Sequence, residues 1–299
     1  MDTIDGMRTF LAVVSQGSFS RAAERLNMSP QLVSKYVAQL ESRLGARLIN
    51  RSTRRLSITE VGQGYFERCR DVLADIDEME SAVGDATAAA RGTLRINAPM
   101  SFGTLHLSRA IADYQCEQPG VSVDLTLDDR VVDIVSEGYD MAIRIGRLQE
   151  SSLVARKLAP IRLVVCGARD YLEKQGIPDT PQDLKDHECL RYTLSSDSDR
   201  WRFKDGDKTL DVPVTGKFSA SNGDAIRLAA MAGRGLALQP TFIVGDDIRE
   251  GHLQLVLGDY EVEPMGLYAI YAHRKYLSGK VRTFVDFLGG YFGSPPYWE

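Results

Sequence analysis

The chain has 299 residues, of which 43% are hydrophobic and 26% charged, and its formal net charge is -5 at pH 7. This composition is ordinary for a globular protein of about two domains, and it excludes a disordered chain, a collagen-like repeat and a small disulfide-built scaffold. The longest apolar runs, such as residues 162–168, are far shorter than the roughly 20 residues that span a bilayer. The first ten residues lack the basic start of a secretory signal. We therefore expect a cytoplasmic protein with no membrane partner.

The four cysteines stand at positions 69, 116, 166 and 189. They form no C-x-x-C pair, and no histidine lies at a zinc-ligand spacing from any of them. We expect free thiols, no metal site and no cofactor.

The charge is distributed unevenly along the chain. Residues 1–60 hold nine basic and five acidic side chains, whereas residues 61–91 and 92–299 are both net acidic. A basic segment at the start of an acidic chain indicates that the first 60 residues contact a polyanion.

Three helices are predicted in this basic segment. In the first, which should end at Gly17, apolar side chains recur at helical spacing at Met7, Phe10, Leu11 and Val14. The second is short and ends near Leu26. In the third, Ser29 suits the N-cap and Pro30 the first turn, where its missing N–H is not needed.

The third helix has an apolar and a polar face. The apolar side chains expected to point inward are Val33, Tyr36, Val37, Leu40 and Leu44. The outward face carries Gln31, Ser34 and Lys35, and small or amide-bearing groups beside a cation are suited to the major groove of DNA. A solvated face of an ordinary amphipathic helix has the same pattern and remains the alternative.

A two-stranded ribbon is predicted after Gly45. Its apolar anchors are Leu48, Leu56 and Ile58, and its tip carries Arg51, Arg54 and Arg55. Three arginines within five residues suit contact with phosphates or with the minor groove.

Residues 22–62 resemble the winged helix-turn-helix signature of LysR-type transcriptional regulators. The matching positions are Ala22, Ala23, Leu26, Ser29, Ser34, Lys35, Leu40, Glu41, Leu44, Gly45, Leu48, Arg51, Arg54, Leu56, Thr59 and Gly62. The resemblance implies a sequence-specific regulator of double-stranded DNA, with contacts from Ser29, Pro30, Gln31, Ser34, Lys35, Arg51 and Arg54. Pro30 and Ile49 stand where many members have Gln and Phe, so no base preference is carried over.

A long helix is predicted from Thr59, a suitable N-cap, into residues 61–91, the segment that the resemblance makes a dimerisation helix and hinge. Its apolar stripe consists of Phe66, Cys69, Leu73, Ile76, Met79 and Val83. We expect a second copy of the chain to cover this stripe, since a 60-residue head offers little else. Packing on the chain's own body is the alternative. The resemblance further implies a homotetramer made of two dimers.

The alternation of strands and helices in residues 92–299 predicts an α/β domain with mostly parallel sheets. Strands are predicted at residues 93–99, 121–127, 140–146 and 162–168, and helices at 102–117 and 131–137. A late strand at 266–274 and a helix at 280–290 are expected to complete the first sheet. The resemblance implies two α/β subdomains with a cleft between them, as in periplasmic binding proteins. The fold class is thus α/β, with a winged helix-turn-helix head in residues 1–60, a linker helix in 61–91 and an effector-binding domain in 92–299.

Ligands of open α/β sheets lie beyond the carboxyl ends of the strands, where helix N-termini offer unbonded amides. The residues expected at such places are Ser101, Phe102, Thr126, Arg144, Asn222 and Gln239. Their hydroxyl, amide and guanidinium groups suit a small carboxylate effector. Ser101 and Asn222 also fit simple helix caps, and Arg144 also fits an ion pair with Asp140.

No catalytic residues are expected. The chain has no G-x-S-x-G, H-E-x-x-H or G-x-x-x-x-G-K-[ST] motif, although scattered residues of the cleft can still form an enzyme site. An architectural DNA binder is disfavoured, because an α/β body of about 200 residues with a net acidic charge is more than anchoring requires. We therefore expect a regulator that senses a small molecule and for which RNA polymerase is a further partner. A DNA-binding regulator without an effector is the alternative.

Overall fold

The computed structural model of the chain describes residues 2–51, 56–83, 90–147, 153–195, 198–206, 208–272 and 277–299. The chain forms two compact units, residues 1–88 and 89–299. The long helix after the ribbon therefore groups with the head. Within the described ranges, no helix is long and apolar enough to cross a membrane.

The first unit contains three helices and a small ribbon. These are α1 (Thr3–Gln16), α2 (Phe19–Leu26), α3 (Pro30–Leu44) and the antiparallel strands β1 (Ile49–Arg51) and β2 (Leu56–Ile58). Gly17 ends α1 in the left-handed region at φ 59, as its position predicted. The core is made of Phe10, Val13, Ala22, Ala23, Val33, Val37, Leu40, Leu48 and Ile49.

Two predicted apolar faces differ from the observed ones. In α1 the buried residues are Gly6, Thr9, Phe10, Ala12 and Val13, so of the four predicted side chains only Phe10 is fully buried. In α3, Leu44 is 41% exposed, because it lies in the last turn, beyond the part of the helix that packs on the core.

Helix α4 (Glu60–Val83) begins as predicted at Thr59, whose hydroxyl accepts a hydrogen bond from the Gly62 amide at 2.9 Å. The Phe66 ring packs edge-on against Phe10 with ring centroids 6.4 Å apart. Cys69 and Leu73 are only 2% and 5% exposed in a single chain. This corrects the expectation that a second copy covers them. Ile76 is half-buried, while the side chains of Met79 and Val83 lie outside the described residues.

The second unit has two five-stranded sheets. The first has the order β4-β3-β5-β15-β6, made of Val121–Leu127, Gly92–Ala98, Met141–Gly146, Met265–Ala272 and Leu153–Ile161. The second has the order β11-β8-β12-β7-β13, made of Ser219–Ala220, Cys189–Tyr192, Leu236–Pro240, Leu163–Ala168 and Leu253–Val256. A small antiparallel sheet joins β10 (Lys208–Pro213), β9 (Arg200–Asp205) and β14 (Glu261–Val262).

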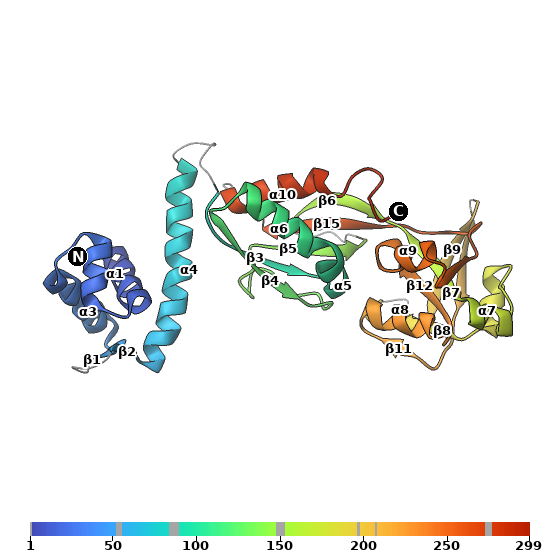
Figure 1. Ribbon diagram of the computed structural model, residues 1–299, viewed down its shortest axis with the longest axis horizontal. Helices are drawn as coiled ribbons and strands as arrows, with labels where there is room; N and C mark the ends of the chain where they lie inside the picture. The colour runs from blue at the N-terminus through green and yellow to red at the C-terminus, as the bar shows by residue number, and fades with distance from the viewer. Residues whose placement is uncertain are drawn as a thin grey trace. The chain divides into compact units, whose positions relative to one another are not determined.

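The sheets are mixed rather than mostly parallel. In the first sheet β3 pairs in parallel with β4 and β5, but β15 pairs antiparallel with β5 and β6. In the second sheet β12 pairs in parallel with β8, which pairs in parallel with β11, whereas β7 pairs antiparallel with β12 and β13. The strand β15 thus returns to complete the first sheet, as predicted. Because β6 runs on almost directly into β7, these two long strands join one sheet to the other (Figure 1).

Helices flank both sheets. A continuous helical stretch runs through α5 (Met100–Phe102), a π-helical turn η1 (Gly103–Leu107) and α6 (Ser108–Glu117). It lies beside α10 (Gly279–Tyr291) over the first sheet (Figure 1). The second sheet carries α7 (Arg169–Gln175), the 3-10 helix η2 (Pro181–Asp186), α8 (Gly223–Met231) and α9 (Thr241–Arg249). The helix predicted at residues 131–137 is wrong, since residues 131–133 are irregular and residues 134–137 form turns.

Candidate DNA-binding surface and effector cleft

The start of α3 has the geometry that its sequence predicted. The Ser29 hydroxyl accepts from the Leu32 amide at 3.2 Å, and Pro30 occupies the first turn. Gln31 and Lys35 are exposed and Ser34 is partly exposed, while Val33 and Val37 on the other side are fully buried. The face predicted to contact DNA therefore points away from the core.

The ribbon is fastened to α3 by a residue whose role the sequence did not reveal. The Glu41 carboxylate accepts from the backbone amides of Leu48 at 2.8 Å and Ile49 at 3.1 Å. One side chain of α3 thus satisfies two backbone donors at the start of the ribbon. Of the predicted arginines, Arg51 has its backbone in β1, while its side chain and all of Arg54 and Arg55 lie outside the described residues.

Two hydrogen bonds join the subdomains of the second unit at the predicted cleft. The Ser101 hydroxyl donates to the Asp224 carboxylate at 2.7 Å. The Asn222 amide donates to Asp129 at 3.2 Å, and the same Asp129 carboxylate accepts from the Met100 amide at 2.8 Å. Asn222 is also the predicted cap of α8, because its side-chain oxygen accepts from the Ala225 amide.

Gln239 lies beside this junction. A Cβ atom added to Gly223 would lie 3.2 Å from the Gln239 side-chain oxygen and 3.4 Å from the Ser101 hydroxyl. Gln239 is 3% exposed, and its Oε1 atom has no hydrogen-bond partner among the described residues. Ser101, Asn222 and Gln239 therefore come together, and a buried acceptor is left unsatisfied there.

Arg144 belongs to a second polar group on the first sheet. It donates to the Asn97 side-chain oxygen at 2.6 Å and not to Asp140, whose carboxylate lies 3.0 Å from the Lys280 ammonium. Burial lowers the pKa of the Arg144 guanidinium. Arg144 NH2 and Asn97 Nδ2 are buried without partners in the described part of the chain. Thr126 is exposed and pairs in register with Asn97 on the neighbouring strand.

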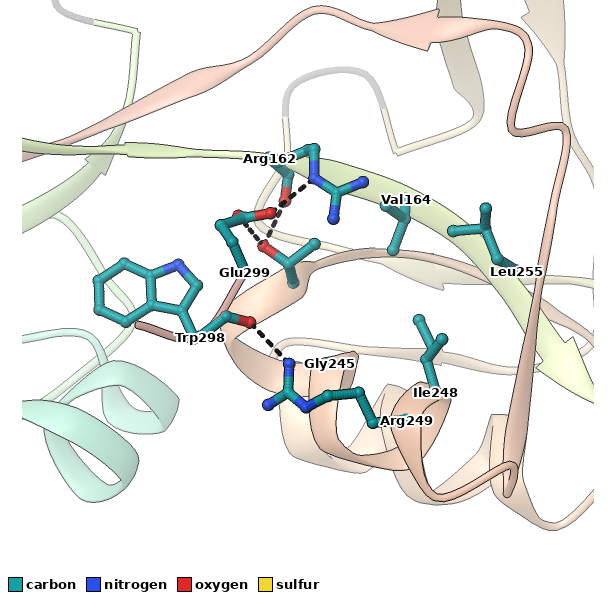
Figure 2. A pocket seen from close by; sticks show the side chains of 9 residues that line it. Arg162, Val164, Gly245, Ile248, Arg249, Leu255, Trp298 and Glu299 are labelled. Atoms are coloured by element: carbon teal, nitrogen blue, oxygen red, sulfur yellow. Dashed lines mark hydrogen bonds and ion pairs between the residues drawn. The ribbon is translucent and has the colours of Figure 1, made fainter. Parts of the chain in front are cut away.

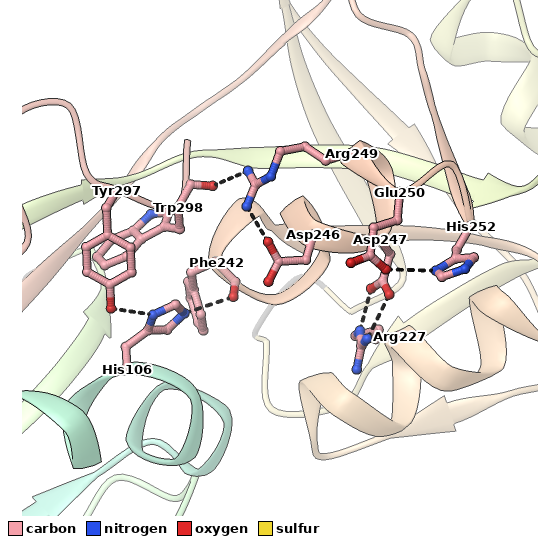
Figure 3. A network of polar contacts seen from close by, with 10 residues as sticks. All are labelled: His106, Arg227, Phe242, Asp246, Asp247, Arg249, Glu250, His252, Tyr297 and Trp298. Atoms are coloured by element: carbon pink, nitrogen blue, oxygen red, sulfur yellow. Dashed lines mark hydrogen bonds and ion pairs between the residues drawn. The ribbon is translucent and has the colours of Figure 1, made fainter.

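Phe102 does not point into the cleft. Its side chain is fully buried and packs edge-on against Phe242 and Trp298, with ring centroids 5.3 and 5.9 Å apart. His106 lies in the same cluster, where its two ring nitrogens contact the Tyr297 hydroxyl at 2.8 Å and the Phe242 carbonyl at 3.0 Å (Figure 3). The Phe102 side chain is thus part of an aromatic core, and the expectation that the Phe102 backbone amide faces an effector stays a prediction.

Two acidic residues at the junction were missed from the sequence. Asp129 follows β4 and Asp224 follows the predicted cap Asn222 and Gly223. The position of Asp129, just beyond the carboxyl end of a parallel strand, was a usable signal for it. Among the described residues, no group of three His, Cys, Asp or Glu side chains is arranged to hold a metal ion. The four cysteines are free thiols, and only Cys116 is exposed.

Comparisons with known proteins cover both units. The family described as bacterial regulatory helix-turn-helix protein, lysR family, matches residues 4–63, and the LysR substrate binding domain matches residues 87–293. The HTH-type transcriptional activator AaeR of Escherichia coli (strain K12) is 34% identical over 293 residues, which cover 98% of this chain and 94% of AaeR. An uncharacterized HTH-type transcriptional regulator of Haemophilus influenzae is also 34% identical, over 94% of this chain and 98% of its own.

The same relationship holds at the level of structure. The LysR-type transcriptional regulator CrgA from Neisseria meningitidis aligns with a TM-score of 0.62 and 31% identity, over 95% of this chain and 97% of CrgA. The matches run through the helix-turn-helix head, the ribbon and both subdomains of the second unit. The chain belongs to the LysR-type family of DNA-binding transcriptional regulators.

Proposed function

We propose that the protein recognises an operator sequence through α3 and the ribbon, and that a small-molecule effector bound in the cleft of the second unit modulates this activity. The observation that carries the proposal is the junction at Ser101 and Asp224. There, two hydrogen bonds close the subdomains on one another while a neighbouring buried acceptor, Gln239 Oε1, stays unsatisfied. A ligand that opens the junction can replace these bonds and satisfy that atom.

Base recognition is assigned to the outward face of α3. Gln31 and Lys35 are exposed near the capped start of the helix, where side chains reach base edges in the major groove. Ser34 adds a small hydroxyl, and Ser29 and Pro30 bring the helix start close to the phosphates. Arg51 and Arg54 of the ribbon are proposed to bind the DNA backbone or the minor groove.

Gel-shift titrations against the promoter region flanking the gene test this assignment. Gln31→Ala and Lys35→Ala should each relax the preference for the operator over unrelated DNA by about 1 to 3 kcal/mol. Gln39→Ala is the matched control, because Gln39 is also exposed on α3 but lies two turns further along. An unchanged preference in the Gln31, Lys35 double variant overturns the assignment.

The effector subsite chemistry has two parts. Arg144 NH2 and Asn97 Nδ2 are unsatisfied donors, which suit a carboxylate, whereas Asp129 and Asp224 are acceptors, which suit a donor group. We propose an effector that carries a carboxylate at one end and a hydroxyl or amino group at the other. Thr126 and Gln239 lie near the carboxyl ends of β4 and β12, one in each sheet.

A thermal-shift screen of small carboxylates with and without a donor substituent tests the cleft. A true effector should stabilise the second unit by RT ln(1 + [L]/Kd), which is about 2.7 kcal/mol at a hundredfold excess over Kd. The stabilisation should be lost in the Ser101→Ala, Arg144→Ala double variant. A hit that survives both changes places the effector elsewhere. Operator binding with no hit across the screen favours the alternative, a regulator that needs no effector.

The assembly is proposed to be a homodimer through α4, and a tetramer by family resemblance. Because Phe66, Cys69 and Leu73 face their own unit, the surface left for a partner includes Val72, which is 45% exposed, and the half-buried Ile76 one turn on. Met79 and Val83 continue the stripe. Ile76→Asp should yield smaller species by light scattering, since an aspartate buried against the apolar surface of a second copy destabilises the dimer. If the variant assembles like the wild type, Ile76 does not lie in the dimer interface.

The remaining expectations belong to the same proposal. A regulator of this kind acts in the cytoplasm, contacts RNA polymerase when it activates transcription, and performs no catalysis of its own. Transcription from the flanking promoter with purified polymerase, with and without the protein, gives the direction of control.

A further inference from the structure

A pocket of about 290 Å³ lies in the second unit, outside the cleft (Figure 2). Its walls come from the start of β7, from α9 and β13, and from residues 298 and 299. None of the residues assigned to the cleft lines it. The volume lies just below the range of about 300 to 1,000 Å³ that is typical of ligand sites.

One end of the pocket binds a carboxylate through Arg162 and Thr241, and this pair of residues is called the seat below. The Glu299 side chain accepts from Arg162 Nε at 2.7 Å and from the Thr241 hydroxyl at 2.6 Å (Figure 2). A guanidinium and a hydroxyl that converge on one carboxylate form a charge-assisted, oriented anion site. The Arg162 side chain is 59% exposed and the Glu299 side chain 20%, so solvent reaches the guanidinium.

One of the lining residues, Trp298, carries a buried donor that lacks an acceptor. Trp298 is 3% exposed, and its indole nitrogen has no hydrogen-bond partner among the described residues. In the view of Figure 2 this nitrogen lies on the ring edge nearer to Arg162 and Glu299. A buried N–H without an acceptor costs free energy, and an added oxygen acceptor removes that cost.

The rest of the lining is mostly aliphatic, apart from Arg249, whose guanidinium is held by the Trp298 carbonyl and by Asp246. Val164, Ile248 and Leu255 line the pocket beyond the carboxylate seat, and Leu255 is 40% exposed. Aliphatic side chains here suit a short hydrocarbon body, and they offer no partner for a second polar group.

We infer that this pocket binds a small aliphatic carboxylate. The ligand carboxylate displaces the Glu299 side chain from Arg162 and Thr241, and it also accepts a hydrogen bond from the Trp298 indole nitrogen. Glu299 then acts as a built-in competitor that occupies the seat when the ligand is absent. The site is separate from the proposed effector cleft, and it does not depend on that proposal.

The two tryptophans of the chain make a direct test possible. Full-length protein labelled with 15N-tryptophan is titrated with hexanoate, and the indole signals are assigned with a Trp201→Phe variant. We expect the Trp298 signal to move downfield in the proton dimension with saturation, and the signal of Trp201, which is buried in β9, to stay in place. Hexan-1-ol at the same concentrations should leave both signals unchanged.

Substitutions then assign the shift to the seat. Glu299→Gln removes the competing charge and should lower the hexanoate concentration at half-saturation, whereas Arg162→Leu should raise it by about tenfold or more. Arg169→Leu, at another exposed arginine just past the end of β7, is the matched control and should change nothing. The Ser101→Ala, Arg144→Ala double variant should keep the response, which separates this site from the cleft. An immobile Trp298 signal, an equal shift with hexan-1-ol, or an unchanged midpoint in Arg162→Leu overturns the inference.

Discussion

The hydroxyl of Ser101 donates to the carboxylate of Asp224 at 2.7 Å, across 123 positions of the sequence and between two sheets. Both partners come from the first turn of a helix that follows a strand, so the contact joins the starts of two helices. A hydrogen bond to an ionised group is stronger than a neutral one, because charge shortens it and adds Coulomb energy. Together with the bond from Asn222 to Asp129, it joins the two subdomains of the second unit.

The first prediction is a measurable coupling between Ser101 and Asp224. We expect Ser101→Ala and Asp224→Ala to be non-additive by about 1.5 to 3 kcal/mol in the unfolding free energy, the usual range for a hydrogen bond to a charged group. Denaturant unfolding of residues 89–299 in a double-mutant cycle measures it. Ser108→Ala serves as a control for the loss of a hydroxyl, since Ser108 bonds only within its own helical stretch. Strict additivity would mean that the bond contributes nothing to the free energy of unfolding of the second unit.

The second prediction concerns the stability of the protein at acidic pH. Burial lowers the pKa of His106 and of His187 below the ordinary value of 6.5. The Phe242 carbonyl can only accept, so His106 Nε2 carries the proton and the neutral Nδ1 accepts from Tyr297. The unfolded imidazole binds a proton below pH 6.5 while the folded one stays neutral. Stability is therefore complete above pH 6.5 and falls as the pH drops from there toward the folded pKa.

Each histidine contributes a slope of at most about 1.4 kcal/mol per pH unit in that window. Chemical denaturation at pH 7.5 and at steps down to pH 5 measures the fall. His106→Gln keeps a donor and an acceptor without titrating, so it should show a shallower fall, with the remainder due to His187. Identical slopes in wild type and His106→Gln would exclude His106 as a source of the acid sensitivity.

The third prediction concerns a buried ion pair at the start of α10. Lys280 is buried, lies 3.0 Å from Asp140 and donates to the Thr93 carbonyl at 2.8 Å. Lys280→Met leaves the Asp140 carboxylate without this partner and should cost about 3 kcal/mol of unfolding free energy, the lower end for a broken buried pair, because Asp140 keeps some solvent contact. The double variant with Asp140→Asn should recover part of that loss. If the double variant is as unstable as the single one, lost packing rather than the stranded charge is responsible.

The sequence predicted the local features well, because their signals are local. Ser29, Gly17 and Asn222 are helix caps whose residue types satisfy or relax the backbone within three positions. The buried strands β3 and β7 were recognisable as apolar, β-branched runs. The ribbon was predicted from its apolar anchors Leu48, Leu56 and Ile58, and the LysR signature covers the same residues at many positions in a fixed register.

The errors arise where distant segments decide the outcome. β15 pairs antiparallel with β5, and β7 pairs antiparallel with β12. The direction of pairing depends on strands that are distant in the sequence, and the pattern of apolar residues within one strand does not indicate it. An apolar stripe on α4 looks the same whether a partner or its own unit covers Cys69. The burial of the Phe102 ring could not be predicted either, because the aromatic residues that surround it come from α9 and from positions beyond 290.

The last prediction tests how the ribbon is held on the head. A Cβ atom at Gly62 would lie 2.1 Å from the Leu48 carbonyl oxygen, which is closer than atoms can approach. Leu48 is also held by Glu41 through its amide, so the ribbon root cannot move away without breaking that bond. At Gly64, two residues on in the same helix, a Cβ atom would meet no other atom within 4 Å. The two glycines therefore form a matched pair in one helix.

We expect Gly62→Ala to destabilise the head and to weaken binding to all DNA sequences alike, because it shifts the ribbon rather than the face of α3 that we propose contacts the bases. Gly64→Ala should be neutral or stabilising by about 0.5 to 1 kcal/mol, the usual gain when alanine replaces glycine inside a helix. Thermal unfolding and gel shifts on operator and non-operator DNA measure both effects. If Gly62→Ala behaves like Gly64→Ala, the approach of α4 to Leu48 does not hold the ribbon in place.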